Sequence, residues 1–150
     1  MYKGKIFAQN KKAFYDYTIL ETFEAGLALI GQEVKSIKNS RISLKGSYII
    51  IRNNELFLIG AKIPAYQPKN APKDYDEERF RKLLLKKAEI KYLIGKSKQK
   101  GLTLMPLKVY NKNNRIKIEF GIAQGKKKYD KREVIKNREF KREKARLLKS

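Results

Sequence analysis

The sequence predicts a mainly β fold with short helices, and three observations support this prediction. Apolar segments flank asparagine-containing turns twice, at residues 47–60 and at residues 102–123, as expected of β-hairpins. β-Branched and aromatic residues are concentrated in residues 15–23, which is typical of a strand. Short antiparallel strands joined in this way favour a closed or partly open barrel of about five or six strands with two or three helices.

The first half of the chain is expected to contain a strand, a helix and a hairpin in this order. The strand of residues 15–23 is expected to continue, after a bend, through residues 26–30. Residues 32–39 carry apolar side chains three positions apart, which predicts a short helix with one apolar face. In the first hairpin, Asn53 and Asn54 tolerate the positive φ angles that a two-residue type I′ turn requires.

The second half is expected to contain a loop, a helix and the second hairpin. Residues 64–79 hold three of the four prolines, which lack an amide donor and restrict the residue before them. We expect Asp76 to cap a following helix, and residues 81–100 to be helical in one or two pieces. Pro106 predicts an edge or a bulge in the first strand of the second hairpin.

The C-terminal part differs from the rest in charge and in the spacing of its apolar residues. We divide the chain into a body, residues 1–123, and a basic tail, residues 124–150. Residues 121–150 hold 12 Lys and Arg against 4 Asp and Glu, and no apolar stripe at helical spacing. We expect the tail to be disordered when free and helical when a polyanion neutralises it. The alternative is a solvated tail that binds polyanions without specificity.

The composition excludes many kinds of catalytic and metal site. The sequence contains no cysteine and no histidine, which excludes disulfides, cysteine nucleophiles, Cys-ligated metal sites and His-dependent triads. An acidic cluster stands among cations and is assigned to helix capping and charge balance; it comprises Asp74, Asp76, Glu77 and Glu78. We therefore predict that the chain is not an enzyme and needs no cofactor or metal.

The net charge is the strongest indication of function. Against 15 Asp and Glu stand 37 Lys and Arg, which gives a net charge of +22 over 150 residues. Such a charge repels itself unless a polyanion neutralises it, and we favour nucleic acid over an anionic membrane as that polyanion. No apolar run approaches the ~18–20 residues of a membrane span, and a signal-peptide pattern is lacking, so we expect a cytoplasmic protein.

Basic and aromatic residues are interleaved near the start of the first predicted strand, at residues 10–17. Lys11 and Lys12 precede several aromatic rings there, which suits neutralised phosphates and a base stacked on a ring. The alternative is that Tyr15 or Tyr17 belongs to the core, in which case strand alternation leaves one ring of a neighbouring pair outside. Residues 125–132 repeat the basic and aromatic pattern.

Five ordered blocks of the chain are long and specific. They are ETFEAGLALIGQEVKSIKN at 21–39, SYIIIRNNELFLIGAKI at 47–63, RKLLLKKAEI at 81–90, KGLTLMPLKVY at 100–110 and GKKKYDKRE at 125–133. From about Asn10 to the C-terminus, the chain resembles the SmpB family of SsrA-binding, or tmRNA-binding, proteins.

The resemblance implies a fold, a function and partners. The implied fold is a closed antiparallel six-stranded OB-like barrel with about three flanking helices and a basic C-terminal tail. The implied function is that of an RNA-binding adaptor without catalysis, which binds the tRNA-like domain of transfer-messenger RNA. The adaptor delivers this RNA to stalled ribosomes for trans-translation. Its tail occupies the empty mRNA channel and the decoding centre as a helix. Elongation factor Tu with the charged RNA is a further implied partner, and the chain is expected to be a monomer.

The resemblance also implies the site residues. In the body, the positions expected to serve RNA binding are Asn10, Lys11, Lys12, Tyr15, Glu24, Leu84 and Lys117. Glu24 faces a polyanion, so it is expected to hold a cation or to accept from a base or a 2′-hydroxyl, and packing is the alternative role of Leu84. In the tail, the positions expected to contact the ribosome are Lys126, Lys127, Tyr129, Asp130, Lys131, Arg132, Leu147 and Leu148.

Three positions depart from the family pattern, and two other functions stay open. Asp76-Glu77 stands where Asp-Pro is frequent, Lys86 stands where His is frequent, and Gln124 stands where a basic residue is common. The alternatives are a structural ribosomal protein or generic RNA-binding barrel, and an RNA-processing enzyme.

Overall fold

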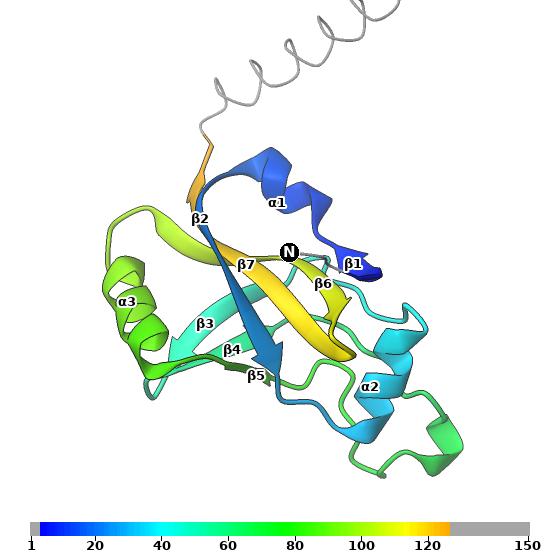
Figure 1. Cartoon of the computed structure of the whole chain (residues 1–150). Coiled ribbons are helices and arrows are strands. Elements are labelled where there is room, and N and C mark those ends of the chain that lie inside the picture. The colour runs from blue at the N-terminus through cyan, green and yellow to red at the C-terminus, as the bar shows by residue number, and fades with distance from the viewer. Residues whose placement is uncertain (1–3, 127–150) are drawn as a thin grey trace, which may run out of the picture.

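One antiparallel sheet dominates the computed structural model, which describes residues 4–126 (Figure 1). Its strands are β1 (Ile6–Gln9), β2 (Tyr17–Leu27), β3 (Tyr48–Arg52), β4 (Glu55–Ile59), β5 (Arg81–Leu84), β6 (Leu102–Lys112) and β7 (Arg115–Gly125). The helices are α1 (Lys11–Asp16), α2 (Gly31–Lys38) and α3 (Lys87–Ser97), and a short 3₁₀ turn covers Pro68–Asn70. The described part is therefore mainly β with three α-helices, as the sequence predicted.

The strand order is β1-β6-β3-β4-β5-β2-β7, and an additional pairing joins β7 to β6. The two longest contacts are those of β7 with β2 and with β6, which run along most of each strand. The described residues form seven strands, more than the five or six that the sequence predicted. The additional strand is β1, whose four residues are too few to show an alternating pattern and which pairs with β6.

Both predicted hairpins are confirmed. Asn53 and Asn54 join β3 to β4 with φ angles of 52° and 59°, and Asn113 and Asn114 join β6 to β7 with 51° and 61°. Two consecutive positive φ angles match the twist of the flanking strands, and asparagine tolerates them better than most residues. The predicted irregularity at Pro106 is also confirmed, since the register of β6 against β7 shifts between Pro106 and Lys108.

The segment before β2 is helical, and β2 has no break in its middle. The strand predicted from residue 15 instead begins at Tyr17, after α1. Strand alternation therefore does not govern Tyr15, and the most exposed ring of α1 is that of Phe14. The predicted bend at residues 24–26 is wrong, because continuous pairing with β7 keeps Glu24, Ala25 and Gly26 extended.

The predicted helix over residues 81–100 is wrong at its start. Residues 81–84 form β5, which pairs with β4 and β2, and α3 begins only at Lys87. So short a segment is ambiguous between helix and strand, and here pairing on both sides decides for the strand. Asp76 caps no helix; its carboxylate instead accepts the amide of Glu78 at 2.9 Å within a turn. The predicted loop over 64–79 and the predicted helix at 32–39 are confirmed, apart from the 3₁₀ turn and one residue at the helix ends.

Buried side chains from β2 to β7 meet in one apolar core, and partly buried apolar side chains of β1 pack against it. The fully buried members include Leu56 and Leu58 of β4, Leu83 of β5, and Ile118 and Phe120 of β7. Leu93 brings α3, and Ile37 brings α2, against the same core. Burial of each such side chain stabilises the fold by about 1.5–3 kcal/mol.

A buried ion pair joins α2 to β5. The side chains of Glu33 and Arg81 are both 0% exposed, and their closest atoms are 2.7 Å apart. Arg81 also donates to the carbonyl oxygens of Ala61 at 2.7 Å and Glu77 at 2.9 Å. Glu33 accepts from Arg79 at 2.6 Å and from the amide of Ile30 at 2.9 Å. The pair is therefore satisfied on both sides, which is the condition under which buried charges are tolerated.

The environment of Glu33 favours its ionised form. Burial alone would raise the pKa of the carboxyl group. Hydrogen bonds from Arg79 and Ile30, together with the charge of Arg81, outweigh that effect and hold the pKa below its ordinary value of 4.5.

We predict that Glu33→Ala lowers the free energy of unfolding by about 3–5 kcal/mol, because it leaves the Arg81 guanidinium buried without its anion. Urea unfolding at neutral pH measures this change. Glu55→Ala is the control: Glu55 pairs with Lys82 at 3.3 Å where both side chains are more than 40% exposed, so about 0–1 kcal/mol is expected. Equal losses in the two variants would contradict the assigned role of Glu33.

The pH dependence of stability offers a second measurement on the same group. Because the pKa of Glu33 is lowered by folding, its contribution is complete above the ordinary carboxyl pKa of 4.5. It is lost as the pH falls through the lowered pKa of the folded state. Between neutral pH and about pH 3, the parent chain is therefore expected to lose more stability than Glu33→Gln.

Candidate nucleic-acid interface

Three of the predicted body residues come together on one face of the sheet. Leu84 of β5 and Lys117 of β7 both pair with Gly26 of β2, and residues opposite one another project from the same face. Glu24 lies two residues before Gly26, so strand alternation puts it on that face as well. The three side chains line one shared hollow. We call the surface around Glu24, Leu84 and Lys117 the Lys117 surface.

Glu24 is held by two donors from β6. Its carboxylate accepts from the buried hydroxyl of Tyr110 and, at 2.9 Å, from the ammonium group of Lys112. Partial burial disfavours the charged carboxylate, but these hydrogen bonds and the nearby Lys117 outweigh it and lower the pKa of Glu24. Burial, together with the bond to Glu24, raises the pKa of the Tyr110 phenol well above its ordinary value of 10. Glu24 therefore stays ionised and neutralises Lys112.

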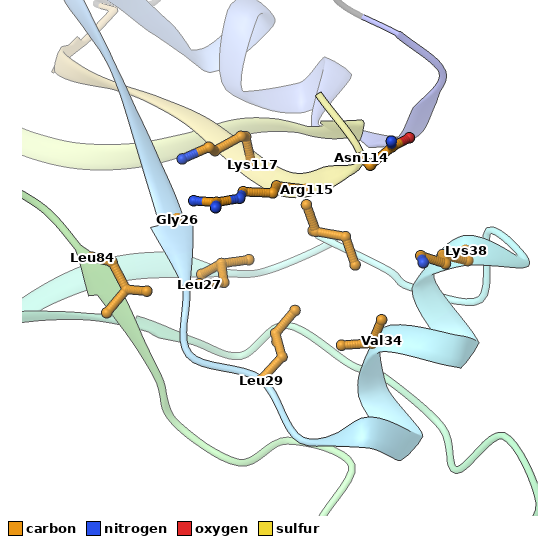
Figure 2. Close-up of a pocket in the computed structure, with 10 residues that line it drawn as sticks. Gly26, Leu27, Leu29, Val34, Lys38, Leu84, Asn114, Arg115 and Lys117 are labelled. Carbon is orange, nitrogen blue, oxygen red and sulfur yellow. The ribbon is translucent and has the colours of Figure 1, made fainter. Parts of the chain in front are cut away.

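An apolar hollow of about 450 Å³ lies beside Gly26 (Figure 2). Figure 2 shows that β2, the segment after it, α2 and β5 line the hollow together with β7; the apolar residues of the first four are Leu27, Leu29, Val34 and Leu84. The side chain of Leu84 is 53% exposed. Ile116 of β7 completes the apolar lining.

Three cations stand around this hollow. Arg115 and Lys117 extend from β7, and Lys38 extends from the last turn of α2 (Figure 2). Within residues 4–126, none of the three forms an ion pair, whereas Lys112 is occupied by Glu24. Cations around an apolar floor can neutralise phosphates while a base contacts the leucine side chains. The described residues contain no group of three or more potential acidic, His or Cys metal ligands.

The four predicted residues at the start of the chain lie elsewhere. Asn10, Lys11 and Lys12 line hollows that share no residue with the Lys117 surface. The segment that holds them precedes β2, and Glu24 lies roughly 23 Å further along that strand. Lys11 and Lys12 are exposed and Tyr15 is half-buried. Asn10 is 7% exposed, and its side-chain amide donates to the carbonyl oxygen of Pro106 at 2.9 Å, so it fastens the chain to β6.

Of the predicted tail residues, only Lys126 is described. Its amide donates to the carbonyl oxygen of Asp16 at 2.9 Å and its ammonium group donates to that of Phe14 at 3.1 Å. The tail therefore leaves the body next to α1. The other predicted tail positions lie outside the described residues; they are Lys127, Tyr129, Asp130, Lys131, Arg132, Leu147 and Leu148.

Sequence reasoning missed several residues of this interface. Arg115 lies two positions before Lys117 on one strand, so a period of two in the basic residues could have identified it. Tyr110 and Lys112 show the same spacing on β6. Lys38 carries no such signal, because only tertiary packing brings α2 beside β7.

Comparisons with known proteins identify similar chains. The model of the family described as "SmpB protein" matches residues 7–150. The SsrA-binding protein of Ralstonia pickettii (strain 12J) is 53% identical over 141 residues, which cover 94% of this chain and 95% of that protein. The SsrA-binding protein of Geobacillus kaustophilus (strain HTA426) is 52% identical, over 94% of this chain and 90% of that protein.

A solved structure also contains a chain that is similar to this one. It is described as "tmRNA-SmpB: a journey to the center of the bacterial ribosome", and its similar chain is 43% identical with a TM-score of 0.65. The match covers 85% of this chain and 92% of the solved one.

We predict that Tyr110→Phe raises the pKa of Glu24, because the variant removes one of the two hydrogen bonds that lower it. Carboxyl titration by NMR measures the change. Tyr92→Phe is the matched control, since the Tyr92 hydroxyl donates at 2.7 Å to Glu21 instead. A Glu24 pKa that moves equally, or not at all, in the two variants would refute the contact.

Proposed function

The chain belongs to the SmpB family, as its five sequence blocks predicted, and we propose on that basis that it is an RNA-binding adaptor that acts in trans-translation. Its RNA is transfer-messenger RNA, which it brings to stalled ribosomes. The observation that carries the proposal is the Lys117 surface, where three cations without ion pairs among the described residues surround an apolar hollow. This combination suits a folded RNA, because cations bind backbone phosphates and an apolar floor receives an unpaired base.

The body supports binding without catalysis. Glu24 is the carboxylate of the Lys117 surface, and it is already engaged by Tyr110 and Lys112. Its lowered pKa makes it a poor general acid or base at neutral pH, since a catalytic group needs a pKa near the working pH. We therefore propose that the carboxylate orients its neighbours and that the protein is not an enzyme.

The strand pairings support a closed barrel. They run from β6 through β3, β4, β5 and β2 to β7, and β7 pairs with β6 again. We propose that this circuit is the OB-like barrel expected from the family, with β1 attached to it through β6.

The tail is proposed to act on the ribosome. Residues 127–150 lie outside the described part of the chain and are rich in basic residues. They follow β7 after one residue, Lys126. In this proposal, the tail is disordered when free and enters the empty mRNA channel as a helix. The basic segment of the tail contacts the decoding centre, and Leu147 and Leu148 pack further along the tail helix. A monomer in the cytoplasm, with elongation factor Tu on the charged RNA, completes the proposal.

We predict that the protein prefers transfer-messenger RNA to tRNA and to an unrelated RNA of equal length, and that the preference persists as salt is raised. Charge-driven binding falls steeply with salt and does not discriminate among RNAs. Filter binding or fluorescence anisotropy over a salt series measures both properties. Equal affinities for the three RNAs at every salt concentration would refute the proposal and favour a generic RNA-binding protein.

A pair of leucine variants locates this preference on the Lys117 surface. Leu84 and Leu20 are 53% and 54% exposed, so truncating either to Ala changes the core little. Leu84→Ala is expected to weaken binding of transfer-messenger RNA about 5- to 30-fold, which corresponds to about 1–2 kcal/mol of lost apolar contact. Leu20→Ala is expected to leave it unchanged.

We predict that deletion of residues 127–150 retains RNA binding but abolishes tagging on stalled ribosomes. The deletion leaves β7 complete, since that strand ends at Gly125. RNA affinity and tagging in a reconstituted translation system measure the two activities. Loss of selective RNA binding together with tagging would instead make the tail part of the RNA-binding unit.

A further inference from the structure

Helix α3 presents more positive charge than its fold requires. Residues 86–100 contain six lysines and one acidic residue, Glu89. Lys96 lies 5.8 Å from the ring centre of Tyr92, and the carboxylate of Glu89 accepts the amide of Lys86. Lys87, Lys91 and Lys98 are exposed, and none of them forms an ion pair within residues 4–126.

Lys87 and Lys91 belong to α3, and Lys98 is its C-cap residue with helical backbone angles, so the three lie on one side of the helix. At about 100° per residue, Lys87, Lys91 and Lys98 fall within an arc of about 40°. With a rise of ~1.5 Å per residue, they span about 16 Å along the axis. We call Lys87, Lys91 and Lys98 the α3 lysine stripe.

Helix stability explains Lys98, since the dipole favours a cation at the C-terminal end, but it does not explain the other two lysines of the stripe. Lys87 and Lys91 are four residues apart, where like charges repel, and Lys87 is a cation in the first turn, where the helix dipole disfavours it. A bound polyanion would turn both costs into a gain.

The helix that carries the stripe is firmly held. Leu93 is fully buried in the core, and the hydroxyl of Tyr92 donates to Glu21 of β2 at 2.7 Å. The ring of Tyr92 also packs on Phe23, with centroids 6.0 Å apart. The lysines are therefore presented from a fixed position relative to β2.

The stripe adjoins the Lys117 surface at its first residue, Lys87. One hollow of about 670 Å³ is lined by Lys87 together with Leu84 and Lys117. Three carboxylates, of Glu24, Glu55 and Glu89, line the same hollow. Because α3 follows β5 after only two residues, the helix starts close to the end of that strand (Figure 1).

We propose that the α3 lysine stripe binds backbone phosphates of the same RNA that occupies the Lys117 surface. The inference rests on the proposed function and extends its site by a second, purely electrostatic contact. The occupant is a continuous RNA backbone, because a nucleic-acid duplex carries a charge every ~1.7 Å of axis, which places several phosphates along the ~16 Å stripe. No base is read there, so the contact adds affinity and orientation rather than sequence preference.

Two double variants that remove the same charge test this proposal. Lys87→Gln/Lys91→Gln removes two lysines of the stripe, and Lys69→Gln/Lys73→Gln removes two exposed lysines of the loop between β4 and β5. For transfer-messenger RNA, the plot of log affinity against log salt is expected to become shallower by about 1.4–1.8 in the first variant, which is the loss of two phosphate contacts. The loop variant is expected to keep the parent slope.

The outcomes separate the contact from unfolding and from bulk charge. The thermal midpoint of Lys87→Gln/Lys91→Gln is expected to equal or exceed that of the parent, since a repulsion is removed. Equal slope changes in both variants, or no change in either, would overturn the proposal. Unchanged binding of this RNA with weaker binding to ribosomes would also overturn it and assign the stripe to the ribosome. A parent chain without RNA preference would refute the proposed function, while the difference between the two variants would still test the stripe.

Directed cleavage gives a readout independent of affinity. The chain has no cysteine, so Ala88→Cys provides one attachment point for an iron chelate on α3 while keeping every lysine. Hydroxyl radicals from this position are expected to cut bound transfer-messenger RNA at a confined set of nucleotides. The same chelate on Lys73→Cys is expected to leave those nucleotides intact. Absence of cleavage from position 88 in a saturated complex would overturn the proposal.

Discussion

The buried pair of Glu33 and Arg81 is the constraint on which the arrangement of this fold depends. It places a full charge of each sign at 0% exposure, between a helix and a strand that are 48 residues apart in sequence. Such burial is tolerated because Arg81 also satisfies carbonyl oxygens from two further segments, at Ala61 and Glu77. One guanidinium therefore fixes α2, β5 and the loop before β5 relative to one another.

The functional surface follows from that arrangement. With β5 held, strand alternation turns Leu83 into the core and leaves Leu84 exposed beside Gly26. With α2 held, Val34 and Lys38 close the other side of the hollow. Within the part of the chain that the structure describes, local pairing then decides which charges stay available. Glu24 neutralises Lys112, and the cations around the hollow form no ion pair, although Lys117 lies near enough to Glu24 to lower its pKa. Part of the general excess of positive charge is thereby concentrated around the hollow that we propose binds RNA.

The confirmed predictions depend on residues that are close together in the sequence, whereas the wrong ones depend on contacts between distant segments. Turn chemistry is local, so Asn53-Asn54 and the second asparagine pair identified both hairpins. No local signal in residues 81–84 distinguishes a helix from a strand, and pairing with β4 and β2 makes this segment a strand. At the site, family resemblance singled out Glu24, Leu84 and Lys117, which the fold brings together. The placement of Asn10 as a buried donor to Pro106 had no signal in the sequence.

The sequence by itself determined the net charge of +22, the absence of cysteine and histidine chemistry, both hairpin turns and the family. These properties depend on composition, on adjacent residues, or on ordered blocks that can be read along the chain. Only the tertiary structure decided that Lys38 stands with Arg115 and Lys117, that the charge of Arg81 is buried, and that α1 lies far along β2 from Glu24. The physical reason is that burial and the pairing of charges depend on which distant segments pack together, and one residue type serves as a buried anchor or an exposed ligand contact according to its neighbours.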